Sequence, residues 1–165
     1  MRKAEIIGLT GHDESPARAL EGGKAAEHLV CAELILQGHR AFLSDQGLPY
    51  DVVVDVGRLI RIQVKSTFYP KDIPQITYSK KYTWHVRRVG KNGRRKIAGN
   101  EFDILALVAL DVRHIAFIPI SDTVPSCVML RPPGPFTKSY RQEPFAKSVD
   151  QFPFADALEE VLCRA

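Results

Sequence analysis

The sequence predicts an α/β (α+β) fold, and three stretches carry that prediction. Residues 50–56 and 59–67 are both rich in Val and Ile and are separated by a Gly-Arg pair, which is the pattern of two strands joined by a turn. Residues 24–37, KAAEHLVCAELILQ, are strong helix formers with a helical apolar period. Residues 102–110, FDILALVAL, form a nearly continuous apolar run, as expected of a central strand buried on both faces.

The N-terminal part is expected to hold a short helix followed by a longer one. Ser15 and Pro16 are a favourable N-cap and first-turn pair, and the Gly-Gly pair at 22–23 is expected to interrupt or re-aim the first helix. The second helix covers residues 24–37, and Gly38 is its expected C-cap.

Glu27 lies on or beside the apolar stripe of that second helix, because the residues three, four and seven positions further on are apolar. A carboxylate in such a place needs a partner. It either pairs with Lys24 at the edge of the helix or points at the polar site of the neighbouring strands.

The two central strands separate an apolar face from a polar one, because alternate side chains of a strand point to opposite faces. The polar face gathers Asp51 from the first strand with Gln63 and Lys65 from the second. An acid, an amide and an ammonium side by side indicate a site for a hard metal ion and a phosphate.

This grouping depends on the length of the turn, because a shift of one residue moves every side chain to the other face. A two-residue turn would place Asp51 opposite Val64 and split the polar group. A three-residue loop over 56–58 places Asp51 opposite Gln63 instead. We therefore predict the odd loop, with Gly57 supplying a positive φ.

The remaining pattern predicts further strands at residues 40–44, 75–88 and 114–120. Residues 124–141 contain PPGP and are expected to be loop-rich. Residues 152–164 are expected to form a C-terminal helix whose inward-facing residues are Ala155, Leu158, Val161 and Leu162. The whole chain, residues 1–165, is expected to be one domain, with a core at about 22–120 and a C-terminal extension at 121–165.

Charge is distributed unevenly along the chain. Residues 58–96 hold 12 basic residues and one acid, so this segment carries +11 and the remainder −7 of a net +4. Such asymmetry favours a polyanionic partner over the alternative of a solvated basic face. The predicted nucleic-acid contacts are the eight basic residues of 80–96, namely Lys80, Lys81, Arg87, Arg88, Lys91, Arg94, Arg95 and Lys96. Aromatic residues alternate along the same stretch, and Trp84 among them is expected to pack in the core.

Several classes of protein are disfavoured. No apolar run approaches about 18 residues, so no membrane span is expected. The N-terminal residues carry acids where a signal peptide is apolar. The three cysteines are widely spaced without a CxxC pair, which favours a reducing cytoplasm over a disulfide framework or zinc site. The absence of a P-loop or Gly-x-Gly-x-x-Gly motif argues against a nucleotide cofactor.

The order of these features resembles the PD-(D/E)xK nuclease superfamily over about residues 24–119. The features that carry the resemblance are Glu27 on a helix, Pro49-Tyr50-Asp51 at a strand start, and Gln63-Val64-Lys65 on the next strand. The chain departs from the motif in two ways, since Tyr50 separates Pro49 from Asp51 and Gln63 replaces an acid. The Gln-x-Lys variant is found in some intron-encoded homing endonucleases and resolvase-like nucleases.

The resemblance implies a restriction-endonuclease-like core, which is a mixed central β-sheet flanked by helices. It further implies that Asp51, Gln63, the Val64 carbonyl and Glu27 bind Mg²⁺, for which Mn²⁺ substitutes, and that Lys65 acts on the attacking water or the phosphate. The expected function is metal-dependent cleavage of DNA by a homodimer or larger homo-oligomer, because two strands need two sites. The alternative is a nucleic-acid-binding module of the same fold that has lost cleavage.

Overall fold

The computed structural model describes residues 15–72, 80–86, 88–90, 93–95, 100–134 and 147–164. The helices of this part are α1 (Pro16–Leu36), the short 3-10 helix η2 (Val149–Gln151) and α2 (Phe154–Cys163). The strands are β1 (Arg40–Leu43), β2 (Val52–Asp55), β3 (Leu59–Thr67), β4 (Lys71–Asp72), β5 (Lys80–His85), β6 (Arg88–Gly90), β7 (Gly93–Arg95), β8 (Ile104–Ala109), β9 (His114–Pro119) and β10 (Cys127–Leu130). None of the described helices is both long and apolar enough to span a membrane.

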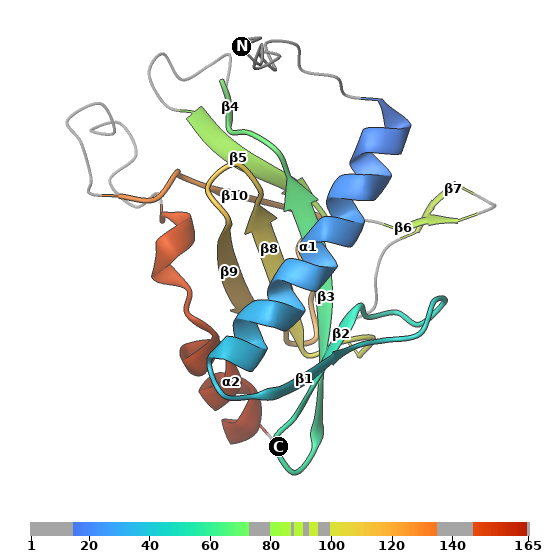
Figure 1. Ribbon diagram of the computed structural model, residues 1–165, viewed down its shortest axis with the longest axis vertical. Helices are drawn as coiled ribbons and strands as arrows, with labels where there is room; N and C mark the ends of the chain where they lie inside the picture. Colours follow the sequence, from blue (N-terminus) through green and yellow to red (C-terminus); the bar gives the residue numbers. More distant parts are fainter. Residues whose placement is uncertain are drawn as a thin grey trace, which may run out of the picture.

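The centre of the molecule is a five-stranded sheet in the order β1-β2-β3-β8-β9 (Figure 1). β3 and β8 run parallel, whereas the other neighbouring pairs are antiparallel. The sheet is therefore mixed, which confirms the predicted fold class. Every residue of β8 is buried, as its apolar sequence predicts.

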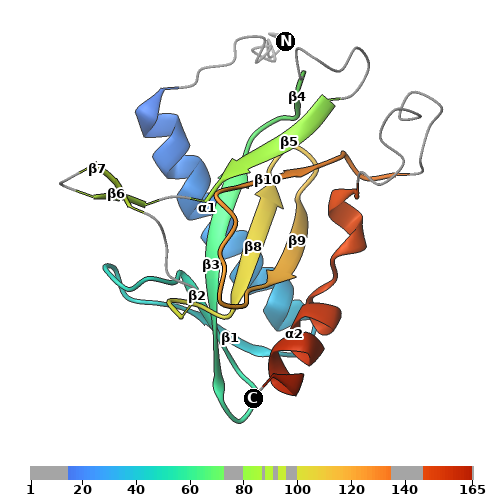
Figure 2. The same ribbon diagram turned by 180° about the vertical axis from the view of Figure 1, so that it is seen from behind.

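The two faces of this sheet are covered by different layers (Figures 1 and 2). Both helices, α1 and α2, pack on one face against alternate residues of β2, β3 and β8. The opposite face of β8 packs against a second sheet, in the order β10-β5-β4, and against η2. One face of β3 is covered by α1, and the other is turned towards β5 of the second sheet. The apolar residues of β3 point to α1, so its polar residues point to the side of the second sheet.

α1 differs from the prediction because it is one continuous helix through the glycine pair at 22–23. Its N-cap is Ser15, whose hydroxyl accepts a hydrogen bond from the Arg18 amide at 3.3 Å, as predicted. Gly22 is buried where the helix crosses Phe68. The packing of the helix against the sheet therefore overrides the low helix propensity of glycine. The helix ends before Gly38, which has the expected positive φ of 90°.

The C-terminal helix forms where predicted, and its buried face agrees with the prediction at Val161 and Leu158, which pack on the core. Phe154, Ala157 and Val161 are buried, whereas Ala155 and Leu162 are exposed. Phe154 packs edge-to-face against His39 and Phe117 and extends the buried face to the first turn of the helix. The segment expected to be loop-rich contains β10, which pairs antiparallel with β5.

Tyr82 and Trp84 of β5 are each 1% exposed and pack against the central sheet, as expected for Trp84. The Trp84 indole donates to the Val108 carbonyl at 3.2 Å. The Tyr82 hydroxyl donates to the Asp111 carboxylate at 2.9 Å, and burial together with this bond raises the pKa of Tyr82. Neither ring is available for stacking on a base.

Candidate active site

The β2–β3 hairpin has the three-residue loop that the sequence predicts. Its central residue, Gly57, has a φ of +91°. Val52 pairs with Ile62, so continuing the register by one residue places Asp51 opposite Gln63. The odd loop therefore brings the acid and the amide together on one face.

The two side chains are joined by hydrogen bonds at the start of β2. The Asp51 Oδ2 atom accepts from the Val64 amide at 2.7 Å and from the Gln63 Nε2 atom. The Gln63 Nε2 atom also donates to the Val64 carbonyl at 3.3 Å. One carboxylate oxygen and one backbone carbonyl thus lie within hydrogen-bonding reach of a single amide.

The Gln63 amide is in an unusual position for a buried polar group. Its side chain is 4% exposed, and its Oε1 atom has no hydrogen-bond partner among the described residues. An unpaired buried acceptor costs about 1–3 kcal/mol. The two ends of a carboxamide have nearly the same shape, so a half-turn exchanges them without moving any neighbour.

That half-turn would put the Gln63 Oε1 atom where its Nε2 atom now lies, beside the Asp51 carboxylate and the Val64 carbonyl. Three oxygens would then converge, which is the donor set that Mg²⁺ prefers. Among the described residues, no three His, Cys, Asp or Glu side chains form a group suited to a metal ion. The chain nevertheless fits a divalent cation if amide and carbonyl oxygens supplement its carboxylates.

A pocket of about 260 Å³ gathers the four predicted catalytic residues. Lys65 is on the same strand face as Gln63, two residues further along β3, and its side chain is partly exposed. The lining residues are Gly23, Glu27, Asp51, Gln63, Val64, Lys65 and Ser66. The structure therefore places a cation, two acids and an amide around one solvent-accessible space.

Glu27 reaches this pocket from α1. The helix is held against the sheet by a buried stripe at four-residue spacing that includes Ala26 and Val30. Glu27 follows Ala26, so it lies beside the stripe, and 24% of its side chain is exposed. It also accepts a hydrogen bond from the Lys24 Nζ atom at 3.0 Å. Glu27 thus pairs with Lys24, as the first alternative predicts, and it also lines the pocket, whereas its role towards a metal ion stays a prediction.

Arg61, the third polar residue on this face of β3, belongs to a separate ion pair. Its side chain donates to both carboxylate oxygens of Asp103, at 3.1 and 3.0 Å, and its backbone amide donates to Oδ2 at 2.8 Å. Burial raises the pKa of Asp103, but the hydrogen bonds from Arg61 outweigh it, so the net pKa is lowered. The pair joins β3 to the start of β8 and lies outside the pocket lining.

The structure sorts the eight predicted nucleic-acid contacts into four groups. Lys80 is exposed at the start of β5, whereas Lys81 is only 7% exposed, so we no longer expect Lys81 to contact a phosphate. Lys81 lies in the middle strand of the β10-β5-β4 sheet and pairs with Lys71 of β4. Arg88, Arg94 and Arg95 lie on the β6–β7 hairpin, of which the structure describes the backbone. Arg87, Lys91 and Lys96 lie outside the described residues.

Sequence reasoning did not identify two residues of the pocket, Gly23 and Ser66. Gly23 precedes Glu27 by four residues, and residues at that spacing share a helix face. The signal was present, but the glycine pair was interpreted as a helix breaker. Ser66 follows Lys65 directly and has no sequence feature that distinguishes it.

This combination of a mixed sheet, a hairpin with an acid, an amide and a lysine, and an acid on the neighbouring helix defines a nuclease-type α/β domain. The chain belongs to the PD-(D/E)XK endonuclease family, whose family model matches residues 20–154. It is also similar to the solved structure of a bacterial homing endonuclease, I-Ssp6803I, with a TM-score of 0.62 and 17% identity. That match covers 88% of this chain and 97% of the other. At this identity the likeness shows a shared fold. No curated protein matches the sequence.

Proposed function

We propose that the protein is a Mg²⁺-dependent endonuclease that hydrolyses phosphodiester bonds in DNA. The observation that carries this proposal is the meeting of Glu27, Asp51, Gln63 and Lys65 in one pocket, where a buried amide oxygen lacks a partner among the described residues. Membership of the endonuclease family supports phosphodiester cleavage. The homing endonuclease of the same fold supports DNA as the substrate.

The proposed ion would be held by oxygens of the pocket. Asp51 would contribute its carboxylate, Gln63 its amide oxygen, and Val64 its backbone carbonyl. Glu27 would bind directly or through water. A bound divalent ion supplies Lewis acidity to a phosphoryl oxygen and lowers the pKa of a bound water.

The chain itself arranges the other groups. The Val64 amide fixes the orientation of the Asp51 carboxylate through its 2.7 Å hydrogen bond, so that ligand is positioned before substrate arrives. Lys65 would donate to the attacking water or neutralise the charge that develops on the phosphate. Asp51 directly precedes β2 and Lys65 lies on β3, so the pairing of these two strands positions both side chains.

The remaining basic residues would hold the DNA backbone. Lys80 is exposed, and the β6–β7 hairpin brings further basic residues of the sequence onto adjacent strands. Phosphate contacts of this kind predict that binding weakens as salt increases. Cutting both strands of a duplex would need two copies of the site, so we propose a homodimer or larger homo-oligomer acting on DNA in the cytoplasm.

The test is cleavage of supercoiled plasmid and of a branched DNA, each with Mg²⁺ and with chelator. Lys65→Ala should lower the cleavage rate at least about 100-fold, as expected when a group that stabilises transition-state charge is lost. Lys147→Ala is the matched control, since that exposed lysine lies over the Phe152 ring and outside the pocket.

Cutting by wild type and Lys147→Ala only with metal would establish the nuclease and locate its centre. Salt-sensitive DNA binding without cutting by any variant would instead favour the alternative of an inactive binding module. The replacement of an acid by Gln63 is the observation that favours that alternative. Cutting by Lys65→Ala at the wild-type rate would contradict the assigned site.

A further inference from the structure

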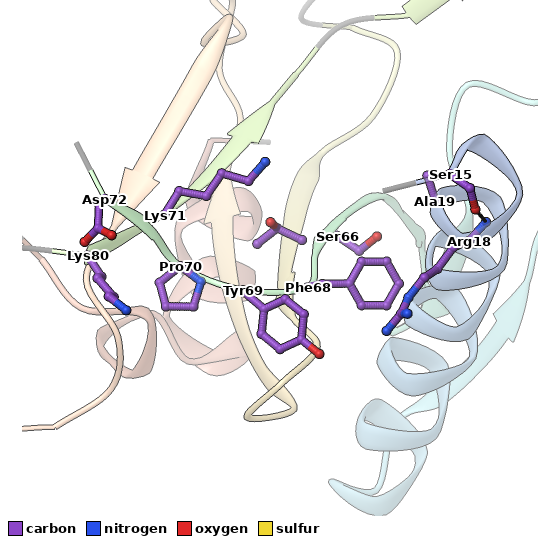
Figure 3. A pocket seen from close by; sticks show the side chains of 11 residues that line it. Ser15, Arg18, Ala19, Ser66, Phe68, Tyr69, Pro70, Lys71, Asp72 and Lys80 are labelled. Carbon is purple, nitrogen blue, oxygen red and sulfur yellow. Dashed lines mark hydrogen bonds between the residues drawn. The ribbon is translucent and has the colours of Figure 1, made fainter. Parts of the chain in front are cut away.

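A second pocket, of about 600 Å³, adjoins the candidate active site. Figure 3 shows the residues that line this second pocket. It lies between the first turn of α1 and the segment of residues 66–72 that leads from β3 into β4. Ser66 lines both pockets. Pockets of about 300–1,000 Å³ accommodate small organic ligands, so this one is larger than a phosphate requires.

The charged lining of this pocket is suited to an anion. Arg18, Lys71 and Lys80 contribute three cations against the single acid Asp72, which leaves a net charge of +2. The pocket also lies at the N-terminus of α1, the positive end of a 21-residue helix. The Arg18 guanidinium is 5.0 Å from the centre of the Phe68 ring, which holds this cation at the pocket wall.

An aromatic surface lies beside these cations. Figure 3 shows the Phe68 ring facing Arg18, and Tyr69 next along the segment that continues to Lys71. The Tyr69 residue is 38% exposed, and its ring centre is 6.3 Å from that of Phe68. A cationic groove with an exposed aromatic ring is the combination by which proteins bind single-stranded nucleic acid, because any base can stack on the ring.

The distance to the catalytic pocket is short. Tyr69 follows Lys65 by four residues, which is at most about 13 Å at roughly 3.3 Å per residue of extended chain. A strand whose scissile phosphate lies at Lys65 therefore reaches this second pocket within a few nucleotides.

We propose that this pocket is a subsite for one unpaired nucleotide of the DNA strand that enters the active site. Arg18 and Lys71 bind its phosphate, and Tyr69 stacks on its base. The inference rests on the proposed nuclease function and deepens it, because a base must leave the duplex to reach the ring. The preferred substrate is then DNA with a single-stranded flap or end next to the cleavage position, over continuous duplex.

The test is binding of two fluorescein-labelled DNAs, measured by fluorescence anisotropy in chelator so that neither is cut. One is a 20-base-pair duplex, and the other is the same duplex with a short single-stranded flap. Wild type should bind the flapped DNA more tightly. Tyr69→Leu should reduce that preference about 5- to 150-fold, the effect of losing one base stack, whereas Tyr69→Phe should retain it. Lys71→Ala should weaken binding of the flapped DNA and lower its salt slope by about 0.7.

The matched control is Arg164→Ala, which removes one positive charge from the exposed end of α2, at the opposite end of the molecule (Figure 1). It should not change the preference for flapped DNA. Equal binding of both DNAs by wild type, or an unchanged preference in Tyr69→Leu, would overturn the proposed subsite. Metal-dependent cutting of plasmid in the same preparation would still support the nuclease. Absence of binding to either DNA together with absence of cutting would overturn both proposals.

Discussion

The two adjacent glycines of α1 provide a sharp test of how the helix that carries Glu27 is seated. Replacing glycine by alanine inside a helix stabilises it by about 1 kcal/mol when nothing else changes. At Gly23, a Cβ would meet no atom within 4 Å. Gly23→Ala should therefore raise the free energy of unfolding by about 1 kcal/mol.

Gly22→Ala should behave differently because the helix lies directly on Phe68. A Cβ at this position would lie 2.5 Å from the Phe68 Cζ atom, 2.8 Å from its Cε2 atom and 3.3 Å from the Leu110 Cδ1 atom. Carbon atoms prefer to stand about 3.5–4.0 Å apart, so the ring must retreat by about 1 Å. Overpacking of this kind costs about 1–3 kcal/mol. After the helix gain of about 1 kcal/mol, the variant should be between about 0 and 2 kcal/mol less stable than wild type.

The assay is urea unfolding of wild type and both single variants, compared at equal m values. A double-mutant cycle with Phe68→Ala gives the coupling directly, because removal of the ring should abolish the cost at Gly22. Gly22→Ala and Gly23→Ala of equal stability, or a cycle without coupling to Phe68, would refute the close seating of the helix.

Two further predictions concern the polar groups of β3. Gln63→Glu should bind Mg²⁺ more tightly in isothermal titration calorimetry, because it adds a negative charge to the oxygen donors; unchanged or weaker binding would count against Gln63 as a ligand. Asp103→Asn should lower the free energy of unfolding by about 1–3 kcal/mol at neutral pH, since it breaks the bidentate pair with Arg61. Because the pKa of Asp103 is lowered from 3.8 in the folded protein, its stabilisation is present above that value and is lost as the pH falls further. The difference between wild type and Asp103→Asn in chemical unfolding should therefore shrink below about pH 4, and a constant difference would contradict the assignment.

The centre of the fold was predictable because its pattern is local. The β2–β3 hairpin has period two, and only an odd loop places Asp51 and Gln63 on one face, so strand position and register followed from the same residues. The sequence alone could not decide whether Glu27 pairs with Lys24 or faces the pocket. Either arrangement gives a half-buried carboxylate the partner that it needs.

The errors arose where distant residues decide the outcome. At Gly22 the helix continues because it packs closely on the sheet, where Phe68, which follows the β2–β3 hairpin in sequence, occupies the space that a side chain would need. Phe154 is buried through edge-to-face contacts with His39 and Phe117, at 4.9 and 5.1 Å between ring centres, and both partners are distant in sequence. Lys81 is likewise buried, although it belongs to the same basic run of the sequence as the exposed Lys80. None of these contacts has a signal in the local sequence.

The parallel pairing of β3 with β8 has a consequence for how substrate preference can change. Two parallel neighbours must be joined by a crossover, and here the connection carries β4 to β7, with Tyr69 and most of the basic segment. Each doubling of a flexible loop costs only about 0.6 kcal/mol in closure entropy. The proposed catalytic residues all precede the crossover, on α1 and on the β2–β3 hairpin. If the proposed function holds, we therefore expect insertions at the β6–β7 hairpin to alter DNA binding while leaving the proposed catalytic pocket intact.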